Sequence, residues 1–256
     1  MKQYDGIFNR AERLLGSDFM QRAAHCRVII FGVGGVGSWC AEGLVRSGIG
    51  HLTLVDSDCV SVTNINRQRM ATGHTVGRPK VEALREQLLE VNPEADIAIV
   101  QQFYSEENAS QFQLEQYDYV IDAIDSLASK VALILHATSC GVPLFSSMGA
   151  ALKFDPTAIR VAEFWNVKGC PLARALRQRF KKEKTFPKHK FQCVYSEELL
   201  ANRGEEKPEP LAGEASMVVT HGNGSLAHIT AIYGFTLSGL ILRDLARKTD
   251  SQNPLA

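Results

Sequence analysis

Residues 27–37 read RVIIFGVGGVG, and this stretch decides the fold expected for the 256-residue chain. The β-favouring residues 28–31 run into a glycine-rich turn, after which residues 38–47 have the composition of a helix. The glycines of the turn are Gly32, Gly34, Gly35 and Gly37. In the spacing G-x-G-x-x-G, glycines permit a tight turn, a close approach of backbone N–H groups to a phosphate, and close packing of helix on strand. We therefore predict a nucleotide-binding unit with phosphate at the positive end of the helix.

A second strand strengthens this interpretation. Residues 51–55 are expected to form it, and it ends at Asp56, nineteen residues after Gly37. An acidic side chain at this place can accept hydrogen bonds from the hydroxyl groups of a ribose. Glycine-rich turns also serve only to pack a helix on a sheet, so the glycines alone would be weak evidence. The following strand and acid make a nucleotide site the better interpretation.

Further strands and helices alternate along the first half of the chain. We expect helices at 4–24, 80–91 and 128–139, and strands at 97–100, 117–122 and 142–146. Such alternation is typical of an α/β protein with a doubly wound, mostly parallel, Rossmann-like sheet. Ligands of such sheets bind at the carboxyl ends of the strands. Polar residues gather there after the second and fourth strands, namely Asn64, Arg67, Asp122 and Asp125.

The second half of the chain departs from this alternation. We expect a strand at 159–164, a basic helix at 171–182, a strand at 191–195, a polar loop at 197–212 and a terminal helix at 224–248. At this length, one elaborated domain is favoured over two. We predict a single domain over residues 1–256, with an N-terminal helix (4–24), a nucleotide-binding core (27–147) and a C-terminal crossover extension (148–256).

Composition limits the partners and the compartment. Lys plus Arg and Asp plus Glu are equal, at 28 each, so net charge predicts no general affinity for nucleic acid and none for DNA. Residues 174–190 are the exception, because they concentrate positive charge. Six scattered cysteines without a C-x-x-C pair argue against a zinc cage and a disulfide framework. Reduced thiols and a charged N-terminus indicate a cytoplasmic location.

The apolar tail at 229–242 is the one segment that raises the question of a membrane. We expect a buried helix, because the run is shorter than the roughly 18–20 residues that span a bilayer. Membrane attachment is the minor alternative.

Several motifs together carry a resemblance to a known family. They are the glycine turn at 32–37, LTLVDSD at 52–58, N-x-N-R at 64–67, VGRPK at 76–80, VNP at 91–93 and DAIDS at 122–126. In this order they resemble the ubiquitin-activating-enzyme-like adenylyltransferases. RLLG at 13–16, GCPLARALRQRFKK at 169–182, QCVYSEE at 192–198 and TAIYGFTLSG at 230–239 extend the resemblance over nearly the whole chain, to the tRNA threonylcarbamoyladenosine dehydratases.

The resemblance implies ATP and Mg²⁺ as ligands and a role for each matched residue. Adenylation brings a carboxylate to the α-phosphate of ATP, so cations and hydrogen-bond donors must offset the meeting of two anions. Arg67 and Lys80 match the phosphate cations, and Asn64 their polar partner. Asp56 would hold the ribose, and Asp125 the Mg²⁺. Asp122 is the weaker candidate of the two aspartates, because its position also suits a structural hydrogen bond.

For two further matched residues, alternatives remain open. Arg13 matches an arginine that reaches the γ-phosphate from the other subunit of a homodimer, and Arg10 is the fallback. Cys193 matches a cysteine in the crossover segment. A lone cysteine in an apolar strand is usually a small buried hydrophobe, and the dehydration can proceed without a thioester. Cys193 is therefore a candidate for covalent chemistry, with a structural role as the alternative.

The resemblance also implies partners. The basic residues 174–190 would bind the anticodon stem-loop of a tRNA, although a solvated helix face is the simpler interpretation of the same charges. A sulfur-transfer or cysteine desulfurase partner is implied by the resemblance as well.

Three functions remain open from the sequence. The first is ATP-dependent dehydration of threonylcarbamoyladenosine in tRNA. The second is adenylylation of the C-terminus of a ubiquitin-like sulfur carrier, against which the missing C-x-x-C pairs count. The third is NAD-dependent redox chemistry or nucleotide sensing, against which Asn64, Arg67, Lys80 and Asp125 count, because a dinucleotide needs no second ring of cations.

Overall fold

The computed structural model describes residues 6–204, 209–210, 217–218 and 222–252. Its α-helices are α1 (Asn9–Leu15), α2 (Ser17–His25), α3 (Gly37–Arg46), α4 (Lys80–Val91), α5 (Leu127–Cys140), α6 (Pro171–Glu183) and α7 (Ala227–Gln252). Its strands are β1 (Arg27–Phe31), β2 (His51–Val55), β3 (Asp96–Val100), β4 (Tyr119–Asp122), β5 (Leu144–Ser147), β6 (Ile159–Glu163), β7 (Gln192–Ser196), β8 (Glu209–Pro210) and β9 (Met217–Val218). Short 3₁₀ turns are η1 (Val62–Asn64), η2 (Ala109–Phe112), η3 (Leu114–Gln116), η4 (Pro156–Ala158) and η5 (Phe164–Asn166).

The main sheet has seven strands in the order β3-β2-β1-β4-β5-β7-β6. Neighbouring strands from β3 to β7 run parallel, and only β6 is antiparallel, to β7. The chain order reverses between β1 and β4, which is where ligands of doubly wound sheets bind. The predicted fold class is confirmed, including the crossover extension that brings β7 back to the sheet beside β5.

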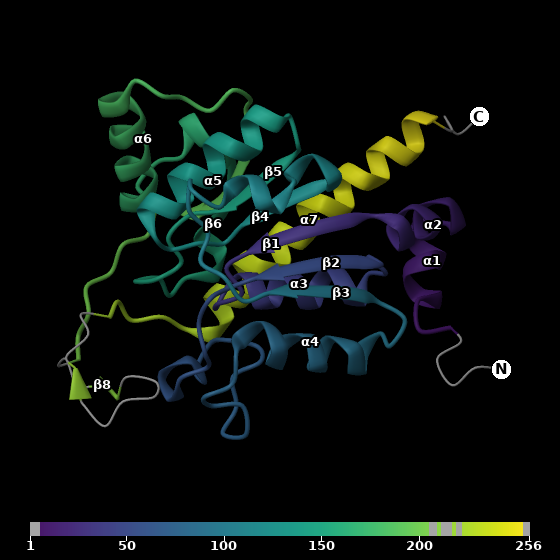
Figure 1. Cartoon of the computed structure of the whole chain (residues 1–256), viewed down its shortest axis with the longest axis horizontal. Coiled ribbons are helices and arrows are strands. Elements are labelled where there is room, and N and C mark those ends of the chain that lie inside the picture. The colour runs from purple at the N-terminus through teal and green to yellow at the C-terminus, as the bar shows by residue number, and fades with distance from the viewer. Residues whose placement is uncertain (1–5, 205–208, 211–216, 219–221, 253–256) are drawn as a thin grey trace.

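Helices cover both faces of this sheet, so β1 is buried on both sides. Val28 and Ile30 belong to the core on the side of α3, α4 and α7, whereas Ile29 and Phe31 belong to the core under α5 and α6. Figure 1 shows these two helical layers above and below the sheet. Burial on both faces explains why the sequence of β1 is continuously apolar rather than alternating.

The helix predicted at 4–24 is wrong as one element. The structure has two helices, α1 and α2, separated at Gly16, whose φ of 82° and ψ of 162° are not helical. Glycine adopts this backbone conformation without the steric penalty that a Cβ would bring. Positions 4 and 5 of the prediction lie outside the described residues, as does part of the polar loop predicted at 197–212. Other boundaries differ from the prediction by four residues at most.

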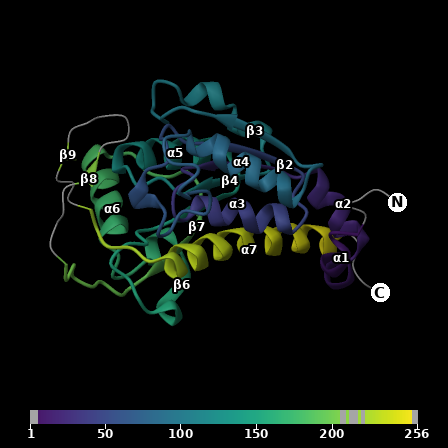
Figure 2. The same cartoon turned by 90° about the horizontal axis from the view of Figure 1, so that it is seen from below.

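The prediction that the apolar tail is too short to span a bilayer was also wrong. Residues Ala227–Thr249 of α7 are long and apolar enough to cross a membrane by length and composition. Half of that apolar window is buried in the protein, where α7 packs along α3 and touches α2, β5 and β7. Figure 2 shows α7 running beside α3 across one face of the molecule. These contacts are typical of the core helix of a globular protein, and burial rather than length supports the predicted buried helix.

The junction between α2 and β2 gives a test of the fold away from the cavity. A Cβ added at Gly50 would lie 2.0 Å from the carbonyl oxygen of Ala24, which is backbone and cannot rotate away. We expect Gly50→Ala to cost about 1–3 kcal/mol of stability and to lower the Tm by roughly 5 °C. Gly73→Ala is the control, because a Cβ there meets nothing within 4 Å. Equal melting temperatures for the two variants in calorimetry would contradict this packing.

Candidate nucleotide-binding site

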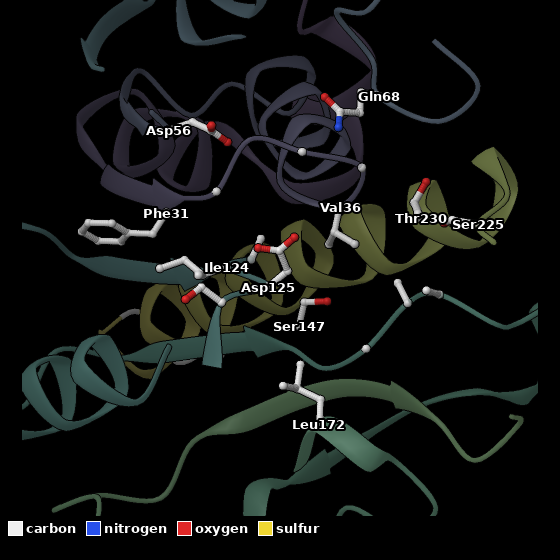
Figure 3. Close-up of a pocket in the computed structure, with 18 of the residues that line it drawn as sticks. Phe31, Val36, Asp56, Gln68, Ile124, Asp125, Ser147, Leu172, Ser225 and Thr230 are labelled. Atoms are coloured by element: carbon white, nitrogen blue, oxygen red, sulfur yellow. The ribbon is translucent and has the colours of Figure 1, made fainter. Parts of the chain in front are cut away.

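A cavity of about 850 Å³ lies at the carboxyl ends of β1, β2 and β4. Its volume is in the range of small-molecule sites. Figure 3 shows Asp56 and Gln68 from the connection between β2 and α4, and Asp125 from the loop after β4, with Ser147 and Leu172 on another side. The charged residues of its lining are Asp56, Asp58, Asp125, Arg67, Lys80 and Lys153. The cavity therefore lies where ligands of such sheets are expected to bind, and its lining carries both positive and negative side chains.

The glycine turn forms one wall of this cavity. Gly32 has a φ of +82°, and a Cβ there would lie 2.7 Å from the carbonyl oxygen of Ala123. A Cβ at Gly37 would lie 1.9 Å from the carbonyl oxygen of Gly32, so the start of α3 packs closely on the residue that follows β1. Gly34 and Gly35 line the cavity, and a Cβ at Gly34 would have nothing nearer than 3.7 Å. The turn therefore needs glycine for its own packing, while its middle stays open to a ligand.

Asp56 follows β2 and is fixed at the wall of the cavity by two backbone donors. The N–H groups of Val33 and Asp58 donate to its carboxylate over 2.8 and 2.9 Å. Burial raises the pKa of Asp56, and the nearby Lys80 ammonium acts in the opposite direction. The bond from Val33 ties the acid directly to the glycine turn. The acid after β2 therefore lies beside the turn after β1.

Lys80 begins α4, and its side chain is held among acids. Its Nζ lies 2.7 Å from Oδ2 of Asp58 and 3.9 Å from Oδ1 of Asp56. The preceding segment is fixed by backbone bonds of 2.8 Å, from the Val60 N–H to the Arg78 carbonyl and from the Gly77 N–H to the Val60 carbonyl. Lys80 is 7% exposed and lines the cavity. Its positive charge therefore faces the ligand site from a rigid helix start.

Arg67 lines the cavity, and Asn64 does not. The Arg67 guanidinium donates to the carbonyl of Thr63 over 2.8 Å and to the side chain of Asn66 over 2.9 Å. The Asn64 side chain accepts from the Ser61 N–H over 3.1 Å and closes a capping box of η1. Asn64 thus shapes the loop that carries Arg67 and makes no contact with the cavity.

The two acids after β4 lie in different environments. Asp125 is exposed and lines the cavity. Asp122 is fully buried outside the lining, where it pairs with Lys130 at 2.9 Å and accepts from the Ser146 hydroxyl at 2.7 Å. It also accepts from the Ile124 N–H at 3.2 Å. These contacts correspond to the structural alternative for Asp122 rather than to a direct contact with a nucleotide.

Two further candidates are not brought into the cavity. Cys193 on β7 is fully buried, and burial raises the pKa of its thiol well above the usual value. Arg13 is exposed on α1. Figure 1 shows α1 at the opposite end of the sheet from the turn that follows β1. The Arg13 guanidinium therefore cannot reach the cavity of its own chain in this fold.

The polar lining residues that were missed from the sequence include Gln68, Ser129 and Lys153. Oε1 of Gln68 and Oγ of Ser129 are buried and have no hydrogen-bond partner in the described part of the chain. Buried polar atoms of this kind are usually satisfied by a ligand or water. Lys153 is 4% exposed, donates to the carbonyl of Glu198, and has a pKa lowered by burial. Gln68 directly follows Arg67 in the sequence, and this neighbour could have identified it as a candidate lining residue.

The burial of Cys193 predicts low thiol reactivity in the folded protein. Because the thiolate is the reactive form, iodoacetamide at neutral pH should label the exposed Cys140 first and Cys193 only after unfolding. Peptide mass spectrometry over a time course measures both sites in one sample. Labelling of Cys193 at the rate of Cys140 in native protein would contradict its burial.

Comparison with known proteins places the chain in a family. Residues 8–254 match the model of the ThiF family. The tRNA threonylcarbamoyladenosine dehydratase of Bacillus subtilis is 34% identical, with 94% of each chain covered. The crystal structure of the Escherichia coli dehydratase TcdA in complex with ATP superposes with a TM-score of 0.85 at 34% identity over 99% of both chains. The molybdopterin-synthase adenylyltransferase of Escherichia coli is 34% identical over 68% of both chains.

The match to the family model and the identity to these relatives extend over nearly the whole chain. Together with a nucleotide-sized cavity at the switch point of the sheet, they show that the protein belongs to the ThiF family of ubiquitin-activating-enzyme-like adenylyltransferases.

Proposed function

We propose that the protein catalyses the ATP-dependent dehydration of threonylcarbamoyladenosine in tRNA by adenylating the carboxylate of its threonyl group. The observation that carries the proposal is the cavity itself, where Arg67, Lys80 and Asp125 surround an open glycine turn. The relatives matched over nearly the whole chain carry the name of this activity, and the Escherichia coli one was solved with ATP.

The reaction starts with an oxygen of the threonyl carboxylate attacking the α-phosphorus of ATP. The bond from the α-phosphorus to the oxygen that bridges it to the β-phosphate breaks, so pyrophosphate leaves and an acyl-adenylate is formed. A nitrogen or oxygen of the same carbamoyl group then attacks the acyl carbon, and AMP departs with one oxygen of the former carboxylate. The ring closes with net loss of water from the nucleoside. An attack within one substrate has a high effective molarity, so no enzyme nucleophile is required, and this agrees with the burial of Cys193.

The following residues of the lining have a part in this scheme. The backbone of the turn at Gly34 and Gly35 approaches the phosphates, and Asp56 accepts from the ribose. Arg67 and Lys80 offset the negative charge that gathers as carboxylate and phosphate meet. Lys80 would exchange its contact with the exposed side chain of Asp58 for a phosphate oxygen. The wall at Lys153 and Leu172 would exclude water from the acyl-adenylate.

Mg²⁺ fits the acids of the cavity. The described residues hold no group of three or more His, Cys, Asp or Glu that could bind a metal by themselves. Mg²⁺ on a nucleotide typically takes one or two carboxylates and keeps waters, and Asp125 offers an exposed carboxylate there. Bound with ATP, the ion would neutralise charge on the departing pyrophosphate.

We also propose a homodimer in which Arg13 completes the site of the other subunit. Arg13 is exposed and distant from its own cavity, so only a second chain could bring it to ATP. Exposed apolar side chains lie on and just before the same helix, with Leu14 at 81% and Ile7 at 44% exposure. Burial of such side chains is a driving force for association.

The tRNA is assigned to the basic residues 174–190. Eight of these seventeen positions are Lys or Arg, and Glu183 is their only acid. The cations exposed in the structure are Arg174, Arg179, Lys181, Lys182, Lys184, Lys188 and Lys190. α6 starts at Pro171 and Leu172 in the cavity lining, so phosphates beside the modified base would meet this charge.

The remaining predictions stand as part of the proposal. Residues 1–256 would act as one ATP-binding domain in the cytoplasm, since β7 and α7 return the extension to the core sheet. A sulfur-transfer or cysteine desulfurase partner stays a prediction of the resemblance.

The substrate is tested by incubating the protein with ATP, Mg²⁺ and tRNA that carries the linear modification. Mass spectrometry of the nucleosides should show an ATP-dependent loss of 18 mass units, the mass of one water, and Cys193→Ser should retain it. No change of mass would reject the proposed substrate. Adenylylation of a ubiquitin-like carrier would then become the leading function, because a relative of that class matches two thirds of the chain.

The assignment of the cations and the acid is tested by ATP/pyrophosphate exchange in the presence of the tRNA substrate. We expect Lys80→Ala and Asp125→Ala to lower exchange by at least about a hundredfold, since each removes charge stabilisation of the transition state. Arg85→Ala is the matched control, because Arg85 is exposed on the same helix as Lys80 and does not line the cavity. Normal exchange in either of the first two variants would mean that the site is misplaced.

The dimer is tested by mixing two inactive variants, Arg13→Ala and Lys80→Ala. A heterodimer would contain one site with both residues intact, so activity should return to about half of the wild-type value per heterodimer. Native mass spectrometry establishes that heterodimers have formed. If they form and stay inactive, Arg13 does not act across an interface.

A further inference from the structure

An exposed pair of aromatic rings stands within the basic surface beside α6. Trp165 is 40% exposed and Phe186 is 47% exposed. Their ring centroids are 6.3 Å apart with an interplanar angle of 44°. Trp165 lies in η5, before α6, and Phe186 follows the end of α6, so the fold brings together two residues that are 21 positions apart. Neither residue lines the nucleotide cavity.

The pair is held on a rigid support. Phe164, next to Trp165, is fully buried and lies 5.1 Å from the indole ring, 5.8 Å from Phe180 and 5.0 Å from Phe191, centroid to centroid. The backbone N–H of Trp165 donates to the Glu163 carboxylate over 3.0 Å. The exposed ring is thus fixed in place before any partner arrives, which lowers the entropic cost of binding.

Cations lie near this pair along the chain. Lys168 is three residues after Trp165, Lys184 is two residues before Phe186, and both are exposed. The Arg177 guanidinium donates to the carbonyl of Phe164, next to Trp165, over 3.1 Å. Exposed aromatic rings among cations are the arrangement by which proteins hold single-stranded nucleic acid, because bases stack on the rings while the cations follow the backbone. Paired helices do not offer their bases in this way.

We infer that Trp165 and Phe186 form a stacking platform for an unpaired base of the RNA that α6 binds. This inference rests on the proposed tRNA substrate and adds to it a contact for a loop nucleotide remote from the modified one. α6 has 13 residues, or about 20 Å at 1.5 Å per residue, between the cavity at its start and the platform at its end. The platform therefore reads the single-stranded character of the RNA, whereas the α6 cations hold its phosphates.

The test compares two RNA probes by fluorescence anisotropy: a hairpin with an unpaired loop, and a fully paired duplex with the same stem. Trp165→Leu and Phe186→Leu keep an apolar side chain and lose the aromatic face. Each should bind the hairpin about tenfold more weakly, equivalent to about 1.4 kcal/mol, with duplex binding unchanged. Trp165→Phe should restore hairpin binding. The double variant Lys181→Ala, Lys182→Ala should bind both RNAs more weakly.

Two controls separate stacking from a general loss of structure. Phe235→Leu removes another exposed aromatic ring, on α7, and should leave binding of both RNAs unchanged. The chain has two tryptophans, so the quenching of intrinsic fluorescence by the hairpin should largely disappear in Trp165→Phe although binding persists. Wild-type affinity of both leucine variants for the hairpin, or equal losses for hairpin and duplex, would overturn the platform.

The platform and the proposed reaction can fail separately. Assayed with modified tRNA, the leucine variants should show a KM for tRNA raised about tenfold and a kcat close to wild type. Dehydration with an unchanged KM would reject the platform and leave the proposed function in place. Selective loss of hairpin binding in a protein that does not dehydrate the nucleoside would support the platform and reject the proposed substrate.

Discussion

The buried ion pair between Asp122 and Lys130 holds the loop on which the cavity depends. Both side chains are fully buried, and the Lys130 ammonium also donates to the carbonyl of Ile124 over 2.9 Å. Asp122 accepts from the N–H of the same residue, so both sides of one peptide segment are fixed. A charge left unpaired at such a depth typically costs about 3–5 kcal/mol. The next residue, Asp125, therefore projects into the cavity from a loop with little freedom.

The same loop supports the glycine turn. The Ala123 N–H donates to the Phe31 carbonyl over 2.8 Å, and the Ala123 carbonyl oxygen lies 2.7 Å from the position that a Cβ of Gly32 would take. Asp56 in turn accepts from Val33. The loops after β1, β2 and β4 are thus joined to one another by short contacts. This order places two cations and an acid at one edge of the sheet before any ligand binds, which is what electrostatic stabilisation of a transition state requires.

Features with a local physical cause could be predicted from the sequence. The glycine spacing, the apolar strands and the polar residues after them indicated the fold and four of the six charged residues of the cavity lining, because each pattern depends on residues close together in the chain. The break at Gly16 could not be predicted, since an amphipathic pattern continues across it. The partner of Asp122 lies eight positions away on α5, and an apolar helix with a single lysine gives no sign that the lysine turns inward. The burial of Cys193 depends on β5 and β6, which flank β7 in the sheet.

The central claim is that this cavity activates a carboxylate by transferring AMP to it. The most direct measurement uses tRNA whose threonyl carboxylate is labelled with ¹⁸O, followed by mass spectrometry of the products of a single turnover with ATP. Because AMP leaves with one oxygen of the former carboxylate, the account predicts one ¹⁸O in AMP and none in pyrophosphate. Dehydrated nucleoside formed together with unlabelled AMP, or with the label in inorganic phosphate, would contradict it.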